Sequence, residues 1–135
     1  MINIIIVDDN PIFSKGINVF LQSAEGFKVI AEASDGNDLL KLLETQTPDL
    51  VIIDIEMDGM NGIDLAKKVN YLYQDLPLIG LTLYWEYTLF DIISAGYKAC
   101  LYKPEATIMI IDVINEVLNG KYSFPKKLFT KKKQF

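Results

Sequence analysis

Acidic, hydroxyl and amine side chains follow directly after four short apolar runs of the chain. The runs are residues 3–7, 50–53, 78–81 and 99–102, and the polar residues after them are Asp8 with Asp9, Asp54, Thr82 and Lys103. Three carboxylates packed together repel each other and have raised pKa values unless a cation joins them. A hard divalent ion with oxygen ligands, for which we expect Mg²⁺, removes this repulsion.

A metal-bound carboxylate beside an amine and a hydroxyl is the arrangement that an acyl phosphate needs. We expect Asp54 to attack a phosphoryl group while the metal and Lys103 neutralise the equatorial oxygens. Thr82 can donate a hydrogen bond to the third oxygen. The unbroken apolar run before Asp54 predicts a strand buried on both faces, with this carboxylate at its carboxyl end. Ligands bind at that end in open parallel sheets.

These side chains meet only if the apolar runs are parallel strands of one sheet. Strands are predicted at residues 3–7, 27–33, 50–53, 78–81 and 99–102, and helices at residues 11–24, 37–46, about 63–74, 85–95 and 105–118. Five strands alternating with five helices at this spacing are typical of βαβ units. The sequence therefore predicts an α/β fold, with a doubly wound five-stranded parallel sheet flanked by five helices.

Length and composition indicate one globular domain. The chain has 135 residues, of which 50% are hydrophobic and 23% are charged. No apolar run approaches the ~18 residues needed to span a bilayer, and no basic region precedes the apolar N-terminus as in a signal peptide. The one cysteine, Cys100, cannot form an internal disulfide. We therefore expect a cytoplasmic protein in a reducing compartment, with no membrane partner.

Charge is distributed unevenly along the chain. Residues 1–120 hold seven lysines and all 18 acidic residues, whereas residues 121–135 hold six lysines and no acid. The chain has no arginine and no histidine. An acidic body without arginine binds nucleic acid poorly by itself. The missing histidines exclude histidine-based catalysis and most zinc sites.

The motifs together resemble those of the receiver domain of two-component response regulators. They are Val7-Asp8-Asp9-Asn10-Pro11, Asp54 with Gly59 and Gly62 behind it, Leu81-Thr82 and Tyr102-Lys103-Pro104. The match covers about residues 1–122, which leaves residues 123–135 as a lysine-rich C-terminal tail or linker stub. Residues 30–36 and 120–125 are similar to the NarL/LuxR type. The resemblance implies a flavodoxin-like fold.

The resemblance also implies a role for each site residue. Asp54 would be the phosphoacceptor, and Asp54 and Asp9 would bind Mg²⁺ directly. Asp8 would act through water, and the backbone carbonyl of Glu56 would be a further ligand. Thr82 would be the switch hydroxyl and Lys103 the lysine that pairs with the phosphate.

A phosphorylation-dependent signalling switch is the function implied. A sensor histidine kinase would supply the phosphoryl group, and the modified domain would change its affinity for partners. Members of the NarL/LuxR type regulate transcription through a C-terminal DNA-binding domain, which this chain lacks. Enzymatic activity would be confined to self-phosphotransfer and slow autodephosphorylation.

Three residues depart from the family pattern. Asp58 stands where proline is usual, Leu83 is larger than the small residue common there, and Cys100 replaces an aromatic residue that rotates inward on activation. On a strand, the side chains of Tyr102 and Cys100 point to the same face of the sheet. Tyr102 is therefore a candidate substitute for the missing aromatic residue. Cys100 itself is expected to be a small buried residue without redox activity. Glu56, two residues after the phosphoacceptor, could alter dephosphorylation.

Other functions stay open on the sequence alone. One is a Mg²⁺-dependent phosphatase with an aspartyl nucleophile, in which Glu56 would stand in as the acid or base. Another is a pseudo-receiver that switches by protein contact without phosphorylation. A nucleotide or flavin module is disfavoured, because neither glycine-rich phosphate-binding motif is present.

The last predicted helix carries more apolar residues than a core-facing surface helix needs. It is either deeply packed or part of an interface, and the interface reading predicts a homodimer through this helix with the first helix or the fifth strand. The lysine-rich tail is expected to be a solvated terminus or linker.

Overall fold

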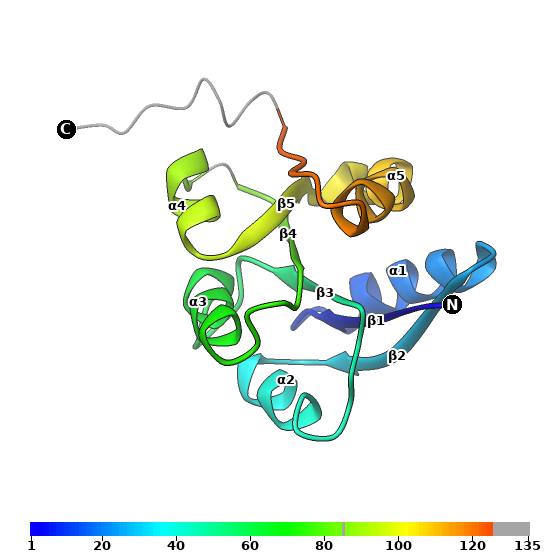
Figure 1. The fold of residues 1–135 in the computed structure, drawn as a ribbon, viewed down its shortest axis with the longest axis horizontal. Helices are drawn as coiled ribbons and strands as arrows, with labels where there is room; N and C mark the ends of the chain where they lie inside the picture. The colour runs from blue at the N-terminus through cyan, green and yellow to red at the C-terminus, as the bar shows by residue number, and fades with distance from the viewer. Residues whose placement is uncertain (85, 126–135) are drawn as a thin grey trace.

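The computed structural model describes residues 1–84 and 86–125. Its core is one parallel sheet in the order β2-β1-β3-β4-β5 (Figure 1). The strands are β1 (Ile2–Val7), β2 (Phe27–Ala33), β3 (Leu50–Asp54), β4 (Leu78–Thr82) and β5 (Tyr97–Tyr102). The helices are α1 (Pro11–Ser23), α2 (Gly36–Leu42), α3 (Gly62–Leu72), α4 (Leu89–Ser94) and α5 (Ala106–Leu118). The predicted fold class is confirmed.

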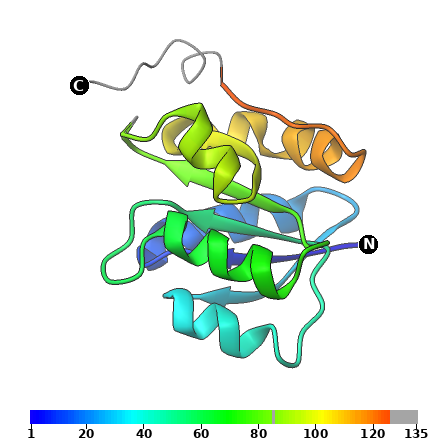
Figure 2. The ribbon, with the colours of Figure 1, turned by 60° about the vertical axis from the view of Figure 1, so that its left-hand side comes forward.

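The helices cover both faces of the sheet, so the molecule has three layers (Figures 1 and 2). Alternate residues of a strand point to opposite faces. Ile4 and Ile6 of β1 accordingly pack with α1 and α5, whereas Ile5 and Val7 pack with α2, α3 and α4. Every residue of β3 and β4 is buried. This two-sided burial explains why these strands are nearly continuous apolar runs.

Two predicted helix boundaries were wrong. The helix predicted from residue 85 begins at Leu89, because Thr88 and Asp91 form a reciprocal capping box that fixes the N-terminus there. The helix predicted over residues 37–46 ends at Leu42.

The end of the sheet also differs slightly from the prediction. Strand β5 begins at Tyr97, two residues earlier than predicted, and Lys103–Glu105 form a 3₁₀ turn before α5. Trp85 lies outside the described residues.

Helix α5 buries one face and exposes another. Its buried residues are Ala106, Ile110, Val113, Ile114 and Val117. Ile108 is 81% exposed, and Met109 and Leu118 are also exposed. The helix is therefore not packed on all sides within this chain, and the predicted homodimer is not tested.

The segment after α5 runs along the outer edge of β5. Ser123 donates from its backbone N–H to the Lys98 carbonyl and accepts from the Cys100 N–H, at 2.9 and 3.1 Å. Phe124 packs against the core cluster that contains Cys100. The predicted domain boundary after residue 122 stays a prediction, and residues 126–135 of the predicted tail lie outside the described part of the chain. No helix among the described residues is long and apolar enough to cross a membrane.

Candidate functional site

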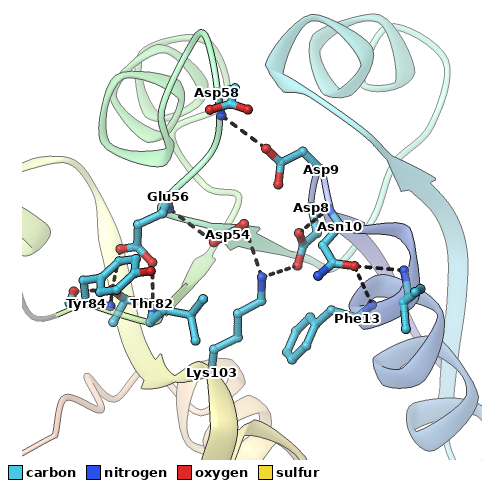
Figure 3. A network of polar contacts seen from close by, with 12 residues as sticks. Asp8, Asp9, Asn10, Phe13, Asp54, Glu56, Asp58, Thr82, Tyr84 and Lys103 are labelled. Carbon is cyan, nitrogen blue, oxygen red and sulfur yellow. Dashed lines mark hydrogen bonds and ion pairs between the residues drawn. The ribbon is translucent and has the colours of Figure 1, made fainter.

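The polar residues singled out by the sequence meet at the carboxyl edge of the sheet (Figure 3). Asp8, Asp54, Thr82 and Lys103 are buried there, each with 6% or less of its surface exposed. Asp9 is exposed at the mouth of the site. The parallel strand order explains the meeting, because β1, β3, β4 and β5 are consecutive neighbours and end on the same side.

The turn after β1 holds the first two carboxylates. Asn10 caps α1 by accepting hydrogen bonds from the backbone N–H groups of Ile12 and Phe13, and Pro11 opens the helix. The Asn10 N–H donates to Asp8 Oδ1 at 2.8 Å. Asp9 Oδ2 accepts from the Asp58 N–H at 3.2 Å. Asp9 thus joins the β1 turn to the loop after β3.

Asp54 is the last residue of β3, and the backbone behind it is tightly supported. Its Oδ1 accepts from the Glu56 N–H at 3.2 Å. The Gly62 N–H donates to the Ile55 carbonyl at 2.8 Å, and the buried Tyr97 hydroxyl donates to the Gly62 carbonyl at 2.7 Å. A Cβ on Gly62 would lie 2.5 Å from Ile55 Cα, so only glycine fits this approach.

Lys103 connects the carboxylates from the opposite side. Its Nζ lies 2.9 Å from Asp8 Oδ2 and 3.3 Å from Asp54 Oδ2. It also lies 4.3 Å from the centroid of the Phe13 ring, a cation–π distance. Burial lowers the pKa of Lys103, but the contacts with Asp8 and Asp54 outweigh burial and raise it above its usual value. The amine is therefore charged at neutral pH.

The charge on this pocket is not balanced. Burial and the neighbouring Asp8 charge raise the pKa of Asp54 from 3.8 to about 7, although Lys103 opposes the rise. Ionising the buried Asp54 beside Asp8 is thus costly, because Lys103 alone does not compensate the acids.

The same residues fit a divalent cation. One carboxylate oxygen from each of Asp8, Asp9 and Asp54 can be chosen so that all lie within 4.8 Å of one another. Asp8 Oδ2 is buried beside Lys103, yet it has no hydrogen-bond donor among the described residues. The contact of this oxygen with the Lys103 ammonium, at 2.9 Å, is an ion pair. Oxygen ligands of this kind suit Mg²⁺.

Glu56 and Thr82 form a second group of contacts beside the carboxylates. Thr82 Oγ1 donates to Glu56 Oε2 at 2.5 Å, and the Leu83 N–H donates to Glu56 Oε1 at 2.7 Å. The sequence suggests the Glu56 backbone carbonyl as a ligand and its side chain as an influence on dephosphorylation or an acid or base, but it does not predict these contacts with Thr82 and Leu83. The adjacency of β3 and β4 could have revealed it, because Asp54 pairs with Leu81 and Glu56 therefore lies near Leu83.

Comparison with known proteins identifies the family. The family model "Response regulator receiver domain" matches residues 4–115. The chain belongs to the response regulator receiver family. It is 33% identical over 122 residues to Response regulator UvrY of Escherichia coli K12, covering 90% of this chain and 56% of the relative. It is 30% identical over 129 residues to Transcriptional regulatory protein LiaR of Bacillus subtilis, covering 95% and 61%.

A solved structure shows the same fold. The isolated receiver domain of RcsB from Salmonella enterica serovar Typhimurium, with the phosphomimetic BeF₃⁻, superposes with a TM-score of 0.83 at 26% identity, covering 95% of this chain and 96% of that one. These relatives are NarL/LuxR-type response regulators, so the predicted family and type are confirmed. The receiver spans about half the length of the curated relatives it matches.

The departures from the receiver pattern have clear positions in the structure. Burial raises the pKa of Cys100 to about 12, and its side chain is fully buried, as expected for a small core residue. Asp58 is exposed, and Leu83 is 42% exposed next to Thr82. Tyr102 is half-buried, and its suggested part in switching stays a prediction.

Proposed function

We propose that this receiver domain is a switch controlled by phosphorylation of Asp54. The observation that carries the proposal is the position of Asp54: a buried carboxylate at a strand end, 3.3 Å from Lys103 and grouped with Asp8 and Asp9. Family membership supports the same reading.

The phosphoryl group would come from a phosphohistidine of a sensor histidine kinase. An oxygen of Asp54 forms the new bond to phosphorus, the bond from phosphorus to the histidine nitrogen breaks, and the histidine leaves with the electron pair. Lys103 can remain paired with Asp8 while it turns toward a phosphoryl oxygen.

Asp9, Asp54 and the backbone carbonyl of Glu56 would hold Mg²⁺, with Asp8 acting through water. When bound, this ion would neutralise charge on the phosphoryl oxygens and permit Asp54 to ionise near neutral pH. The fit rests on the grouped carboxylates, whose negative charge Lys103 alone does not balance.

The output would be a change in partner affinity around Thr82 and the segment that leads to β5. In the full protein, this change would regulate transcription through a DNA-binding domain outside the present chain, as the name of the relative LiaR suggests. A cytoplasmic location and a homodimer through α5 are parts of the same proposal. The chain would act on its own phosphoryl group and on no external metabolite.

Phosphate labelling tests the proposal directly. The chain is incubated with Mg²⁺ and acetyl phosphate, and the intact mass is measured. We expect one phosphate adduct in the wild type and in Asp112→Ala, an exposed acid on α5, but none in Asp54→Ala. Absence of both an adduct and BeF₃⁻ binding in the wild type would refute phosphorylation and favour the pseudo-receiver.

The phosphatase alternative predicts a different result, namely rapid turnover of small phosphate esters. It needs Glu56 as an acid or base near the reacting phosphorus. The Glu56 carboxylate instead accepts two hydrogen bonds from Thr82 and Leu83, which argues against that role.

A further inference from the structure

Glu56 contacts both the phosphoacceptor and the switch hydroxyl, through different parts of the same residue. Its backbone N–H donates to Asp54 Oδ1 at 3.2 Å. Its side chain extends to the end of β4, where the two carboxylate oxygens accept from Thr82 Oγ1 and the Leu83 N–H (Figure 3).

The Thr82 hydroxyl has only one proton to donate. Two acceptors lie near it, Glu56 Oε2 and the Tyr84 carbonyl, each at 2.5 Å from Thr82 Oγ1. The same oxygen accepts from the Tyr84 N–H at 3.2 Å. The hydroxyl is therefore already satisfied by contacts within the loop. To bond a phosphoryl oxygen on Asp54, it must give up its bond with Glu56 or with Tyr84.

Of the two acceptors, Glu56 is the stronger competitor. A hydrogen bond to an ionised carboxylate is roughly twice as strong as one between neutral groups. The second bond, from the Leu83 N–H at 2.7 Å, fixes the carboxylate in place next to Thr82. Glu56 is only half-buried, so the carboxylate can turn to solvent after Thr82 leaves it.

We propose that Glu56 is a positioning residue that holds Thr82 in the unphosphorylated arrangement and sets the threshold for switching. The inference rests on the proposed function, because the competing acceptor is a phosphoryl oxygen on Asp54. Removing the Glu56 carboxylate leaves the hydroxyl only its weaker acceptor, the Tyr84 carbonyl, so the switched arrangement becomes more populated before any phosphoryl group arrives.

The test compares Glu56→Ala with Asp58→Ala, an exposed acid two residues further along the same loop. Each variant removes one negative charge near the acidic pocket, but only the first removes the contacts with Thr82 and Leu83. The measurements are the apparent affinity for BeF₃⁻ with Mg²⁺ and the NMR positions of the Thr82 methyl and the Leu83 amide.

We expect Glu56→Ala to bind BeF₃⁻ about tenfold more tightly, the effect of losing one competing charged hydrogen bond. Its ligand-free NMR signals should move toward the BeF₃⁻-bound positions, and Asp58→Ala should show neither effect. Glu56→Gln should be intermediate, because its single oxygen accepts from only one of the two donors. In a Thr82→Ala background, Glu56→Ala should change BeF₃⁻ affinity no more than Asp58→Ala does.

Equal effects of Glu56→Ala and Asp58→Ala would overturn the inference and assign the change to general charge repulsion. The inference would also be overturned if, in the Thr82→Ala background, Glu56→Ala still raised BeF₃⁻ affinity more than Asp58→Ala does. Failure of the wild type both to bind BeF₃⁻ and to form the phosphate adduct would instead overturn the proposed function. The ligand-free Thr82 methyl signal would then decide separately whether Glu56 positions Thr82, because Glu56→Ala should shift it and Asp58→Ala should not.

Discussion

The two halves of the site differ in how well their polar groups are satisfied. In the acidic half, the carboxylates of Asp8, Asp9 and Asp54 are grouped together, and among the described residues Lys103 forms ion pairs with Asp8 and Asp54. In the switch half, Thr82 and the Leu83 N–H are both bonded to Glu56. The acidic half carries more negative than positive charge, whereas the polar groups of the switch half form hydrogen bonds within the protein.

The difference indicates how a local event can be transmitted. A cation relieves repulsion among the carboxylates and needs no change in the switch half. A phosphoryl group on Asp54 adds new acceptor oxygens, and Thr82 can serve them only by leaving an existing bond. Under the proposed function, charge would govern the loading of the site, and competition for hydrogen-bond donors would govern the response.

Gly62 supports both halves, and its substitution should have the largest effect. Its N–H bonds the Ile55 carbonyl, and the Ile55 N–H bonds the Leu81 carbonyl next to Thr82. A Cβ would meet backbone atoms that cannot move aside. Gly62→Ala should lower the free energy of unfolding by about 4 kcal/mol, more than ordinary overpacking. Urea denaturation measures this cost.

Gly16→Ala is the matched control. Gly16 lies in α1, and a Cβ added there would have no other heavy atom within 4 Å beyond its own helix backbone and chain neighbours. Alanine at this position should stabilise the protein by up to about 1 kcal/mol. If Gly62→Ala lowered the free energy of unfolding by less than about 1 kcal/mol, the two halves would not depend on the close approach of the Gly62 and Ile55 backbones.

Lys103→Met tests the acidic half alone. The substitution leaves Asp8 and Asp54 together without their shared partner, and breaking a buried ion pair from one side is strongly destabilising. We expect a loss of about 2–4 kcal/mol at pH 8 without metal, measured by urea denaturation. Millimolar Mg²⁺ should recover part of the loss. An unchanged midpoint would mean that Lys103 does not balance these charges.

Asp54→Asn tests the cost of the unbalanced charge. The pKa of Asp54 is about 7 in the folded protein, whereas its ordinary value is 3.8. Between pH 3.8 and pH 7, the folded state therefore keeps a proton on Asp54 that the unfolded state has lost. Wild-type stability should therefore fall as pH rises from about 4 to 7. The Asn variant lacks this penalty and should be more stable at pH 8 by about 1–2 kcal/mol, with little difference at pH 4.

Thermal unfolding without metal across this pH range measures the difference. Asp112→Asn on α5 serves as the control and should follow the wild type. Added Mg²⁺ should narrow the gap at pH 8, since the ion stabilises only the carboxylate form. A gap that is the same at pH 4 and pH 8 would contradict the raised pKa.

Leu83→Ala should have the smallest effect. It tests whether this side chain restricts access to Asp54 from the switch half. Leu83 is 42% exposed beside Thr82, so its truncation should change stability by less than about 0.5 kcal/mol. We expect a few-fold faster acetyl phosphate labelling of Asp54. Leu72→Ala, exposed at the end of α3, is the control. Equal rates in the two variants would show that Leu83 does not restrict access.

Much of this protein could be predicted because its local signals agree with its fold. Apolar runs long enough only for strands, each followed by a polar residue, indicated a parallel sheet with Asp8, Asp54, Thr82 and Lys103 at one edge. The start of α4 was missed, since residues 85–88 have suitable types for a helix and only the capping box of Thr88 with Asp91 fixes the boundary.

By itself, then, the sequence determined the order of strands and helices and the chemical types gathered at the carboxyl edge, because burial periodicity is a local property. Only the tertiary structure decided with which groups those side chains form hydrogen bonds. The contact of Glu56 with Thr82 depends on β3 lying beside β4 in one register, and the close approach at Gly62 depends on Tyr97 packing beneath it. Such contacts join residues 26 and 35 positions apart, so no local pattern records them.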